Sequence, residues 1–254
     1  MLNEDRNIIS ELSEAESRAN TSKVDKEELL LQYGDLQGIE LLREMITHVF
    51  PGRIALVSSF GAHSAILLDM VSLIDKRTQI IFLDTGKLFD ETLSYQESLV
   101  PRLGLENVQK LQPAQIDIEK HDPSGDLWSS DSDRCCHIRK VRPLQDSIIN
   151  FDCWITGRKR YQGGLRSDLK TIEFVDEATK INPLALWSTT MVEEYFERRE
   201  LPYHPLFQHG YLSLGCVPCT RPVDKNGNER DGRWSNSDRA ECGIHGNDLR
   251  KSDY

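Results

Sequence analysis

The chain has 254 residues, a formal net charge of −10 at pH 7 and a hydrophobic content of 38%. That length allows one large domain with a sizeable core, and the acidic balance excludes nucleic-acid binding through bulk charge. Any anionic ligand must therefore be held by a local group of basic residues. No apolar run could span a bilayer, and the N-terminus lacks the order of a signal peptide. We therefore expect a cytoplasmic protein without membrane contact, in which cysteines stay reduced or bind a metal.

The first part of the chain is more acidic than the rest. Residues 1–35 contain nine acidic and four basic residues, which is half of the net charge. Their leucines indicate only weak helix. We expect an acidic N-terminal arm (1–35), an α/β domain (36–215), and a mobile C-terminal segment (216–254) that completes the site.

A buried strand followed by a small polar turn comes early in that domain. An amphipathic helix is predicted over Ile39–Phe50, and the wholly apolar run Ile54–Val57 is typical of a buried parallel strand. The turn that follows leads into an apolar helix, Ala65–Leu73. Backbone N–H groups between a strand and a helix N-terminus can bind phosphate, although the Gly-Lys-Ser/Thr of a Walker loop is missing. The candidate residues of this turn are Ser58, Ser59, Phe60 and Gly61.

Further strands alternate with helices along the chain. The predicted strands are Ile80–Leu83, Val108–Leu111 and Cys153–Gly157, and the predicted helices are 89–103, 135–149 and 189–200, the last capped by Thr189 or Thr190. Residues 123–134 are predicted to be a loop. This alternation predicts a three-layer α/β/α sandwich with a mostly parallel twisted sheet. Asp84, Thr85 and Gly86 follow a strand end, where ligands bind in such sheets, although Asp84 could instead cap a helix.

A basic segment follows the fourth predicted strand. Residues 158–170 contain five basic residues and one acidic residue, in a protein that is acidic overall. A solvated loop is the simpler interpretation. We favour an anion clamp, because guanidinium groups form paired hydrogen bonds with phosphate or sulfate oxygens.

The six cysteines carry the most specific pattern. Cys135 and Cys136 are adjacent, and Cys216 and Cys219 form a C-x-x-C pair about 80 residues further on. Four thiolates from two distant segments predict a metal or cluster site, with a disulfide or unrelated thiols as the alternative. An adjacent pair suits a [4Fe–4S] cluster better than a single zinc ion, because the cluster spreads its iron corners apart.

The other two cysteines have different surroundings. Cys153 lies in an apolar strand and is expected to be a core residue. Cys242 lies near the C-terminus between polar residues and close to His245. A reactive thiol is one interpretation, and a fifth cluster-linked thiol or an incidental residue is an equally weighted alternative.

Together these motifs resemble the sulfonucleotide reductases, in particular the bacterial adenylylsulfate (APS) reductases. The resemblance covers residues 36 to 247 or so. It is carried by Cys135-Cys136-x-x-Arg139-Lys140, Cys216-x-x-Cys219-Thr220 and Glu241-Cys242-Gly243-Ile244-His245. Ser58–Gly61 matches the family's modified pyrophosphatase-type loop, and Leu83–Gly86 matches the strand end beside it. It implies a fold related to the adenine-nucleotide α-hydrolases. It also implies thioredoxin-dependent reduction of APS to sulfite and AMP in sulfate assimilation.

The resemblance also implies roles for individual residues. Cys135, Cys136, Cys216 and Cys219 would hold the [4Fe–4S] cluster, and Lys140 would link cluster and substrate. Cys242 would be the nucleophile that forms an S-sulfocysteine, with His245 orienting the site or binding phosphate. Substrate would be bound by the turn at Ser58, by Asp84–Gly86, by Arg160, Gln162 and Arg166, and by Arg230 and Arg233. His63 and Gly163-Gly164-Leu165 depart from the family's usual residues.

Other functions stay open at this stage. A phosphoadenylylsulfate (PAPS) reductase or a dual APS/PAPS reductase is the nearest alternative, although the PAPS branch typically lacks these cysteine pairs. A PP-loop tRNA-thiolation enzyme would need an acidic residue in the turn at Ser58 and a basic RNA-binding face. A non-catalytic zinc or cluster module is the third alternative. The oligomeric state is undetermined, and a homo-oligomer is compatible with the sequence.

Overall fold

The computed structural model describes residues 24–224, 227–234 and 241–245. The chain divides into two compact units, Met1–Gly34 and Asp35–Tyr254. The described part of the first unit is helix α2 (Lys26–Tyr33), and the Asp25 carboxylate caps it by accepting hydrogen bonds from the backbone N–H groups of Glu27 and Glu28. The second unit contains the sheet and the cleft described below.

A six-stranded sheet forms the centre of the second unit, within the described residues. Its strand order is β3-β2-β1-β4-β6-β5, and every neighbouring pair is parallel except β5 and β6. The strands are β1 (Ile54–Ser58), β2 (Gln79–Leu83), β3 (Val108–Leu111), β4 (Cys153–Ile155), β5 (Ile172–Val175) and β6 (Ala178–Ile181). The strand order reverses at β1 and β4, so the carboxyl ends of these strands are the expected ligand-binding edge.

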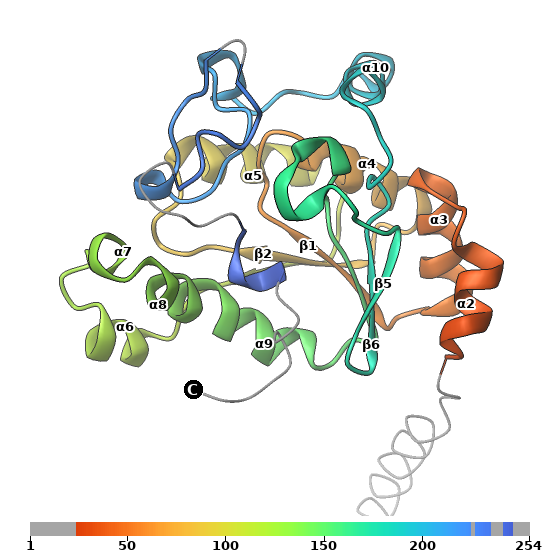
Figure 1. The fold of residues 1–254 in the computed structure, drawn as a ribbon, viewed down its shortest axis with the longest axis horizontal. Coiled ribbons are helices and arrows are strands. Elements are labelled where there is room, and N and C mark those ends of the chain that lie inside the picture. The colour runs from red at the N-terminus through yellow and green to blue at the C-terminus, as the bar shows by residue number, and fades with distance from the viewer. Residues whose placement is uncertain (1–23, 225–226, 235–240, 246–254) are drawn as a thin grey trace, which may run out of the picture. The chain divides into compact units, whose positions relative to one another are not determined.

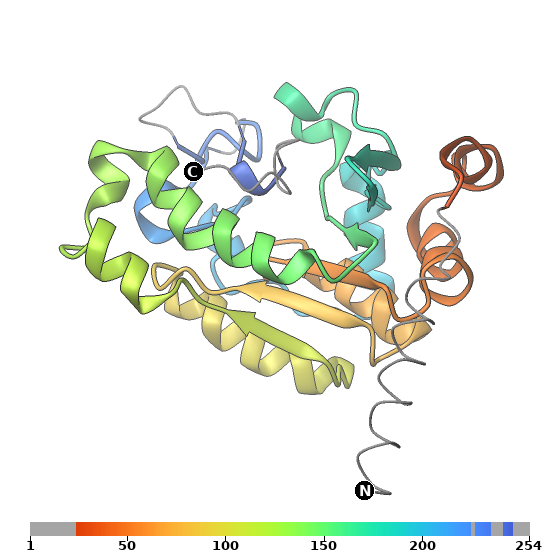
Figure 2. The same ribbon diagram turned by 90° about the horizontal axis from the view of Figure 1, so that it is seen from below.

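Helices cover both faces of this sheet. Helices α4 (Ser64–Ile74) and α5 (Asp90–Leu103) lie on one side, and α9 (Arg142–Ile148) lies on the other (Figures 1 and 2). The predicted α/β fold with a mostly parallel sheet is confirmed.

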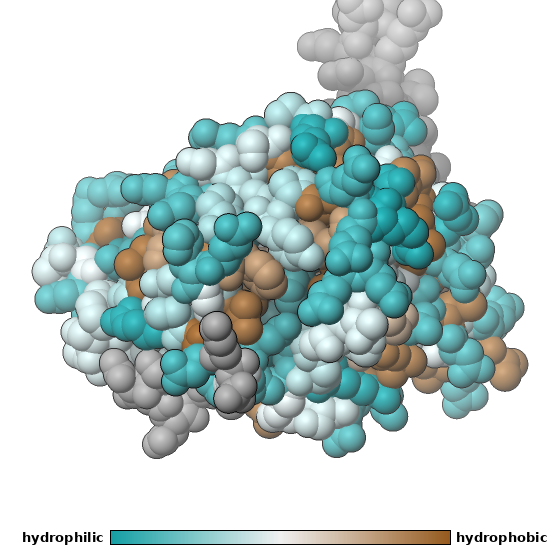
Figure 3. Space-filling model, turned by 90° about the horizontal axis from the view of Figure 1, so that it is seen from above, coloured by the Kyte–Doolittle hydropathy of each residue, from teal (hydrophilic) through white to brown (hydrophobic). Residues whose placement is uncertain are grey.

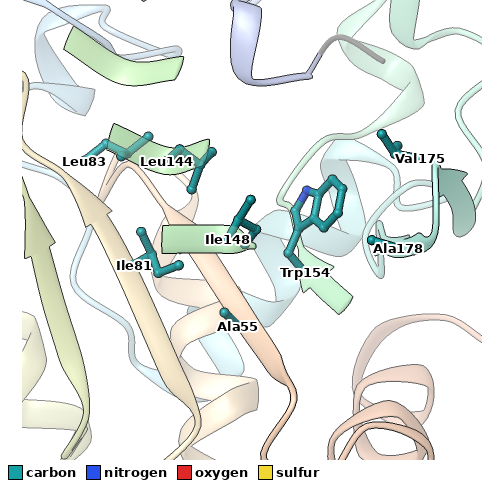
Figure 4. Close-up of a cluster of buried hydrophobic side chains, with 8 residues drawn as sticks. All are labelled: Ala55, Ile81, Leu83, Leu144, Ile148, Trp154, Val175 and Ala178. Atoms are coloured by element: carbon teal, nitrogen blue, oxygen red, sulfur yellow. The ribbon is translucent and has the colours of Figure 1, made fainter. Parts of the chain in front are cut away.

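Wholly apolar strands are needed because both faces of the sheet are buried. Ala55, Ile81 and Trp154 pack with Leu144 and Ile148 of α9 in one core cluster (Figure 4). The alternate residues, such as Leu56, Ile80 and Phe82, are also almost completely buried. A strand buried on both faces has no polar side, which explains the apolar runs in the sequence.

Five further α-helices lie along the described chain between α2 and the C-terminal segment. They are α3 (Gly38–Glu44), α6 (Gln115–His121), α7 (Leu127–Ser130), α8 (Ser132–Cys136) and α10 (Thr189–Arg199), and π-helical turns extend α3 over Met45–Val49 and join α8 to α9 over His137–Val141. The second π-helical turn carries Lys140, and π-turns inside helices are frequent at functional sites.

The structure differs from the sequence expectations in three places. Helix α10 is capped by the Ser188 side chain, which accepts a hydrogen bond from the Met191 backbone N–H, and not by Thr189 or Thr190. The β5–β6 hairpin was not predicted, because its short strands contain polar residues and its turn has no Asn-Gly or similar signal. The segment 123–134 contains α7 and the start of α8, and is therefore not a simple loop.

The face in Figure 3 shows mostly hydrophilic side chains, with apolar ones in separate small groups. Among the described residues, no helix is both long enough and apolar enough to cross a membrane.

Candidate active site

A cleft of about 190 Å³ opens at the carboxyl ends of β1, β2 and β4. Segments from across the second unit meet there, including the β1–α4 turn, Lys140, the residues after β4, and the C-terminal residues 241–245. Of the predicted site residues, those that line it are Ser58, Ser59, Gly61, Thr85, Lys140, Gln162, Arg166, Arg230, Arg233, Cys242 and His245. This is the edge that the strand order marks for ligand binding.

The β1–α4 turn forms one wall of the cleft. Ser58 Oγ accepts a hydrogen bond from the Phe60 backbone N–H at 3.2 Å, and Phe60 takes a left-handed backbone conformation with φ 47°. The Phe60 ring points into the core against Phe82, with ring centroids 5.0 Å apart. Phe60 therefore shapes the turn from behind, while Ser59 and Gly61 face the cleft.

Four predicted substrate-binding residues do not line the cleft: Phe60, Asp84, Gly86 and Arg160. The four predicted cluster ligands, Cys135, Cys136, Cys216 and Cys219, lie outside the lining as well. The Asp84 carboxylate accepts hydrogen bonds from the Gly86 backbone N–H and from Gln112, which is a role in the local turn. Arg160 Nε donates to the backbone carbonyl of Leu169 at 2.7 Å and so braces the basic segment.

Arg158 and Lys159 take the place in the cleft that was predicted for Arg160. Arg158 is paired with the carboxylate of Glu173 on β5 and with the amide oxygen of Asn182. Lys159 donates to the carbonyl of Gly157, and burial lowers its pKa to about 8. The unpredicted hairpin thus supplies the carboxylate that compensates one of these charges.

The two cysteine segments meet at Thr85. Thr85 Oγ1 lies 3.2 Å from Cys216 Sγ, and the Thr85 carbonyl accepts a hydrogen bond from Arg139 Nη1 at 2.8 Å. Arg139 belongs to the helical turn that follows Cys135 and Cys136, and it also pairs with the buried Asp122. One residue at the end of β2 therefore joins both halves of the predicted ligand set.

All six cysteines are free thiols, so the disulfide alternative does not apply to this structure. Burial raises the pKa of Cys135 to about 11, and the neighbouring thiolates of Cys136 and Cys216 add to this. Ionised thiols that lie near one another repel, and the iron ions of a cluster would supply the compensating charge. Cysteine thiolates are the ligands that iron–sulfur clusters use, so the residue types of the two segments fit such a group. The positions do not form a site for a single ion, because among the described residues no three His, Cys, Asp or Glu side chains lie close enough together to hold one.

Two cations of the cleft lining, the buried Lys140 and the half-buried Arg233, lie close to the cysteines. Burial alone would lower the pKa of Lys140, but the neighbouring Cys216, Cys242 and Cys136 outweigh it and raise that pKa. Arg233 donates to the Leu214 carbonyl at 2.9 Å, and burial lowers its pKa despite the thiols around it. A Cβ on Gly215 would lie 2.4 Å from Arg233 Nη2, so a glycine is required where this guanidinium passes.

Cys242 reaches the cleft on a segment that the body of the protein holds in place. The preceding Glu241 carboxylate pairs with Arg166 and with Arg230, at 2.5 and 3.1 Å. Arg166 also donates to the side-chain oxygen of Gln162. In this structure Arg166 and Arg230 therefore contact a carboxylate of the protein's own chain.

His245 lies beside Cys242 in the cleft. Its backbone N–H donates to the Cys242 carbonyl at 3.0 Å, and its Nδ1 has no hydrogen-bond partner within the described part of the chain. Burial, with further contributions from the cations Arg158, Arg166, Lys180 and Arg230, lowers the pKa of His245 well below its ordinary value. The imidazole is therefore neutral at physiological pH.

Sequence reasoning missed the cleft residues Arg158, Lys159 and Glu241. It also missed Lys180, which does not line the cleft but donates to the His245 carbonyl. The first two lie in the basic segment, but no pattern shows which of its side chains turn inward. Glu241 is part of the quoted cysteine motif, yet one sequence does not reveal its partners. Lys180 is on the unpredicted strand β6, where a lysine gives no functional signal.

The fold and the site define an α/β protein with a cationic cleft at its strand ends and a thiol inside that cleft. The chain belongs to the phosphoadenosine phosphosulfate reductase domain family, whose model matches residues 53–222. Among curated proteins it is similar to the adenosine 5'-phosphosulfate reductase of Mesorhizobium japonicum, with 44% identity over 87% of both chains. It is 42% identical to the adenosine 5'-phosphosulfate reductase of Chelativorans sp., over 88% of this chain and 92% of that protein.

Solved structures give the same family and a wider fold group. A phosphoadenylyl-sulfate (PAPS) reductase from Candida auris, crystallised as a phosphate complex, matches with a TM-score of 0.67 and 25% identity over 80% of this chain and all of that chain. An FMN adenylyltransferase of Candida glabrata matches with a TM-score of 0.51 and 16% identity, over 80% of this chain and 74% of that chain, which shows a shared fold alone.

Proposed function

We propose that the protein reduces adenylylsulfate (APS) to sulfite and AMP, with Cys242 as the nucleophile. The observation that carries the proposal is the presence of the Cys242 thiol in one cleft with the β1–α4 turn and the cations Lys140 and Arg233. The names of the curated relatives agree with this substrate.

The nucleotide would be bound by the turn at the end of β1. Backbone N–H groups and the N-terminus of α4, an 11-residue helix, favour a negatively charged phosphate there. The sulfate group would then extend toward Lys140 and Arg233. Those two cations would lower the cost of bringing a thiolate against a negatively charged group.

The chemistry requires two transfers that balance with a dithiol. The Cys242 thiolate attacks the sulfate sulfur, the bond from sulfur to the bridging oxygen breaks, and AMP leaves with that oxygen. A thiolate of thioredoxin then attacks Cys242 Sγ and releases sulfite. The second thioredoxin thiol resolves the mixed disulfide, so thioredoxin supplies both electrons and Cys242 returns to the thiol.

A [4Fe–4S] cluster would be held by Cys135, Cys136, Cys216 and Cys219. When bound, it would supply a cross-link between the two cysteine segments and a fixed charge beside Lys140. The bonds of the proposed reaction are broken by the Cys242 thiolate and by the two thioredoxin thiols. Lys140 and Arg233 hold the sulfate, and the neutral His245, with its unpartnered Nδ1, provides a hydrogen-bonding group beside the reacting sulfur.

Mass spectrometry of the anaerobically purified protein after incubation with APS, without thioredoxin, tests this function. We expect a sulfite adduct on the peptide that contains Cys242, and a Cys242→Ser variant that forms neither adduct nor sulfite. Retained sulfite production by that variant would refute the nucleophile. Running PAPS in parallel distinguishes an APS reductase from a PAPS or dual enzyme, which the family name and the Candida auris structure keep as the second candidate.

A further inference from the structure

Cys242 lies between two residues that are each fastened to the body of the protein. On one side, Glu241 Oε2 accepts a hydrogen bond from Arg166 Nε at 2.5 Å, and Glu241 Oε1 accepts from Arg166 Nη2 at 2.8 Å. The same Oε1 accepts from Arg230 Nη2 at 3.1 Å and from the Cys242 backbone N–H at 2.9 Å. One carboxylate thus joins two arginines to the backbone of the thiol-bearing residue.

The other side is fastened by a different element. Lys180 on β6 donates from Nζ to the His245 carbonyl at 3.2 Å, and the same Nζ lies 5.9 Å from the Trp154 ring centroid. Ile244, between these contacts, packs against the core cluster. Residues 242–245 therefore have a polar contact at each end and an apolar contact between them.

The charges around Glu241 favour this arrangement. Burial opposes the ionisation of its carboxyl group, but Arg166 and Arg230 outweigh burial and hold the pKa of Glu241 below its usual range. Its side chain is 14% exposed, so these are desolvated, charge-assisted hydrogen bonds. Such bonds hold a backbone more firmly than surface ion pairs do.

We propose that Glu241 and Lys180 are positioning residues that fix the Cys242 thiol in the cleft. The inference rests on the proposed function for its purpose, because a nucleophile placed in advance avoids an entropic cost at the reaction step. It also gives Arg166 and Arg230 a role different from that implied by the family resemblance. They hold the nucleophile's segment through Glu241, and Lys140 and Arg233 face the substrate anion.

The first experiment measures the thiol itself and needs no nucleotide. The anaerobically purified full-length protein is treated with iodoacetamide, and carboxamidomethylation of the Cys242 peptide is followed by mass spectrometry. Loss of the charged hydrogen bonds in Glu241→Gln should raise the Cys242 alkylation rate about tenfold. Lys180→Met loses a single hydrogen bond to a carbonyl and should raise the rate about threefold.

Asp69→Asn is the matched control. Asp69 accepts hydrogen bonds from Nε and Nη2 of Arg199, as Glu241 does from Arg166, but neither Asp69 nor Arg199 lines the cleft or contacts residues 241–245 among its described hydrogen bonds. We expect the Cys242 alkylation rate of this variant to equal that of the wild type. Equal rates in wild type, Glu241→Gln and Lys180→Met would overturn the proposal.

Steady-state kinetics then tests positioning against direct substrate binding. Glu241→Gln should lower kcat about tenfold with the KM for APS changed less than twofold, because the nucleophile is misplaced while the substrate contacts remain. A raised KM with unchanged kcat would show that Glu241 instead tunes substrate binding. Glu241→Asp keeps the charge on a shorter side chain and should fall between wild type and Glu241→Gln in both assays.

The two proposals can fail separately. If the protein does not turn over APS, the alkylation rates still decide whether Glu241 and Lys180 hold Cys242. If it turns over APS and the alkylation rates do not differ, the proposed function stands and the positioning role is refuted. Iron content and circular dichroism of each variant show whether the fold is retained.

Discussion

At the scale of single residues, Lys140 is a cation that lies beside the thiols and also lines the cleft. It lies on the π-helical turn that follows the adjacent cysteines, and its side chain is buried beside Cys216 and Cys242. A buried ammonium is costly unless anions compensate it. Burial opposes the ionisation of Cys216, but Lys140 and other neighbours outweigh it and lower the pKa of this thiol, so Cys216 is the anion that compensates Lys140 in the free protein. The sulfate of the substrate would do so during the reaction.

Lys140→Met keeps the length of the side chain and removes the charge. We expect kcat for APS to fall by about 10²–10³, as when a preorganised charge that stabilises a transition state is removed. If Lys140 acts on the substrate, the visible absorbance of the proposed iron–sulfur cluster should equal that of the wild type. Sulfite release and iron content measure the two effects.

Lys87→Met provides the control for this substitution. Lys87 lies close to the same strand end, but its Nζ donates to the Gly125 carbonyl and it is not part of the cleft lining. The kcat of the Lys87→Met variant should equal that of the wild type. Loss of iron in step with loss of activity in Lys140→Met would mean that Lys140 supports the cluster only.

At the scale of secondary-structure elements, the sequence predicts best where burial imposes a pattern. The runs at Ile54 and Ile80 must be apolar because helices cover both faces of their strands, so their place and type could be read directly. The β5–β6 hairpin lies at the sheet edge with mixed residues, so no pattern marked it. Its absence from the prediction also hid Glu173 and Lys180, which hold other parts of the site.

The basic segment shows why a site is harder to predict than a fold. Its charge indicated an anion-binding loop, but 3₁₀ turns at Arg160–Gln162 and Gly164–Arg166 decide which side chains face the cleft. Gly163 takes φ 70°, a left-handed conformation that reverses the chain between the two turns. Periodicity carries no information about such irregular backbone.

Helix α5 and the segment after α10 are joined by a buried histidine whose protonation should affect stability. His204 Nδ1 accepts a hydrogen bond from the Leu206 backbone N–H, so Nε2 carries the proton that is donated to Thr92 Oγ1 at 3.0 Å. Burial lowers the pKa of His204 to about 4. Protonation would remove the Nδ1 bond and place a charge in the core.

The unfolded protein binds more protons than the native protein between about pH 4 and the ordinary histidine pKa near 6.5. Stability is therefore full above pH 6.5 and falls as the pH decreases toward 4. We expect the titration of His204 to lower the free energy of unfolding by about 2 kcal/mol when the pH falls from 7 to 5. Thermal unfolding at the two pH values should show a smaller difference for His204→Gln than for the wild type. An equal difference would contradict this contribution.

At the scale of the whole molecule, two distant segments depend on one meeting point. The segments that carry Cys135 and Cys216 touch the same residue, Thr85, and the backbone N–H of Val217 donates to the Lys87 carbonyl at 2.8 Å. These few contacts close a loop of about 80 residues. A cluster bound by the four cysteines would close the same loop covalently and would therefore stabilise the fold as well as the site.

Removal of iron under anaerobic conditions should therefore lower the unfolding temperature. A cross-link across a loop of this length stabilises by about 4 kcal/mol, which corresponds to a fall of about 10 °C in a chain of this size. Cys135→Ser should unfold at the same temperature as the iron-free wild type, because an incomplete ligand set cannot hold the cross-link. Cys242→Ser removes a thiol that is not a proposed ligand. This variant should therefore retain iron and unfold at the same temperature as the iron-loaded wild type. If the iron-free and iron-loaded proteins unfold at the same temperature, the fold depends on the protein's own contacts and the cluster serves only the cleft.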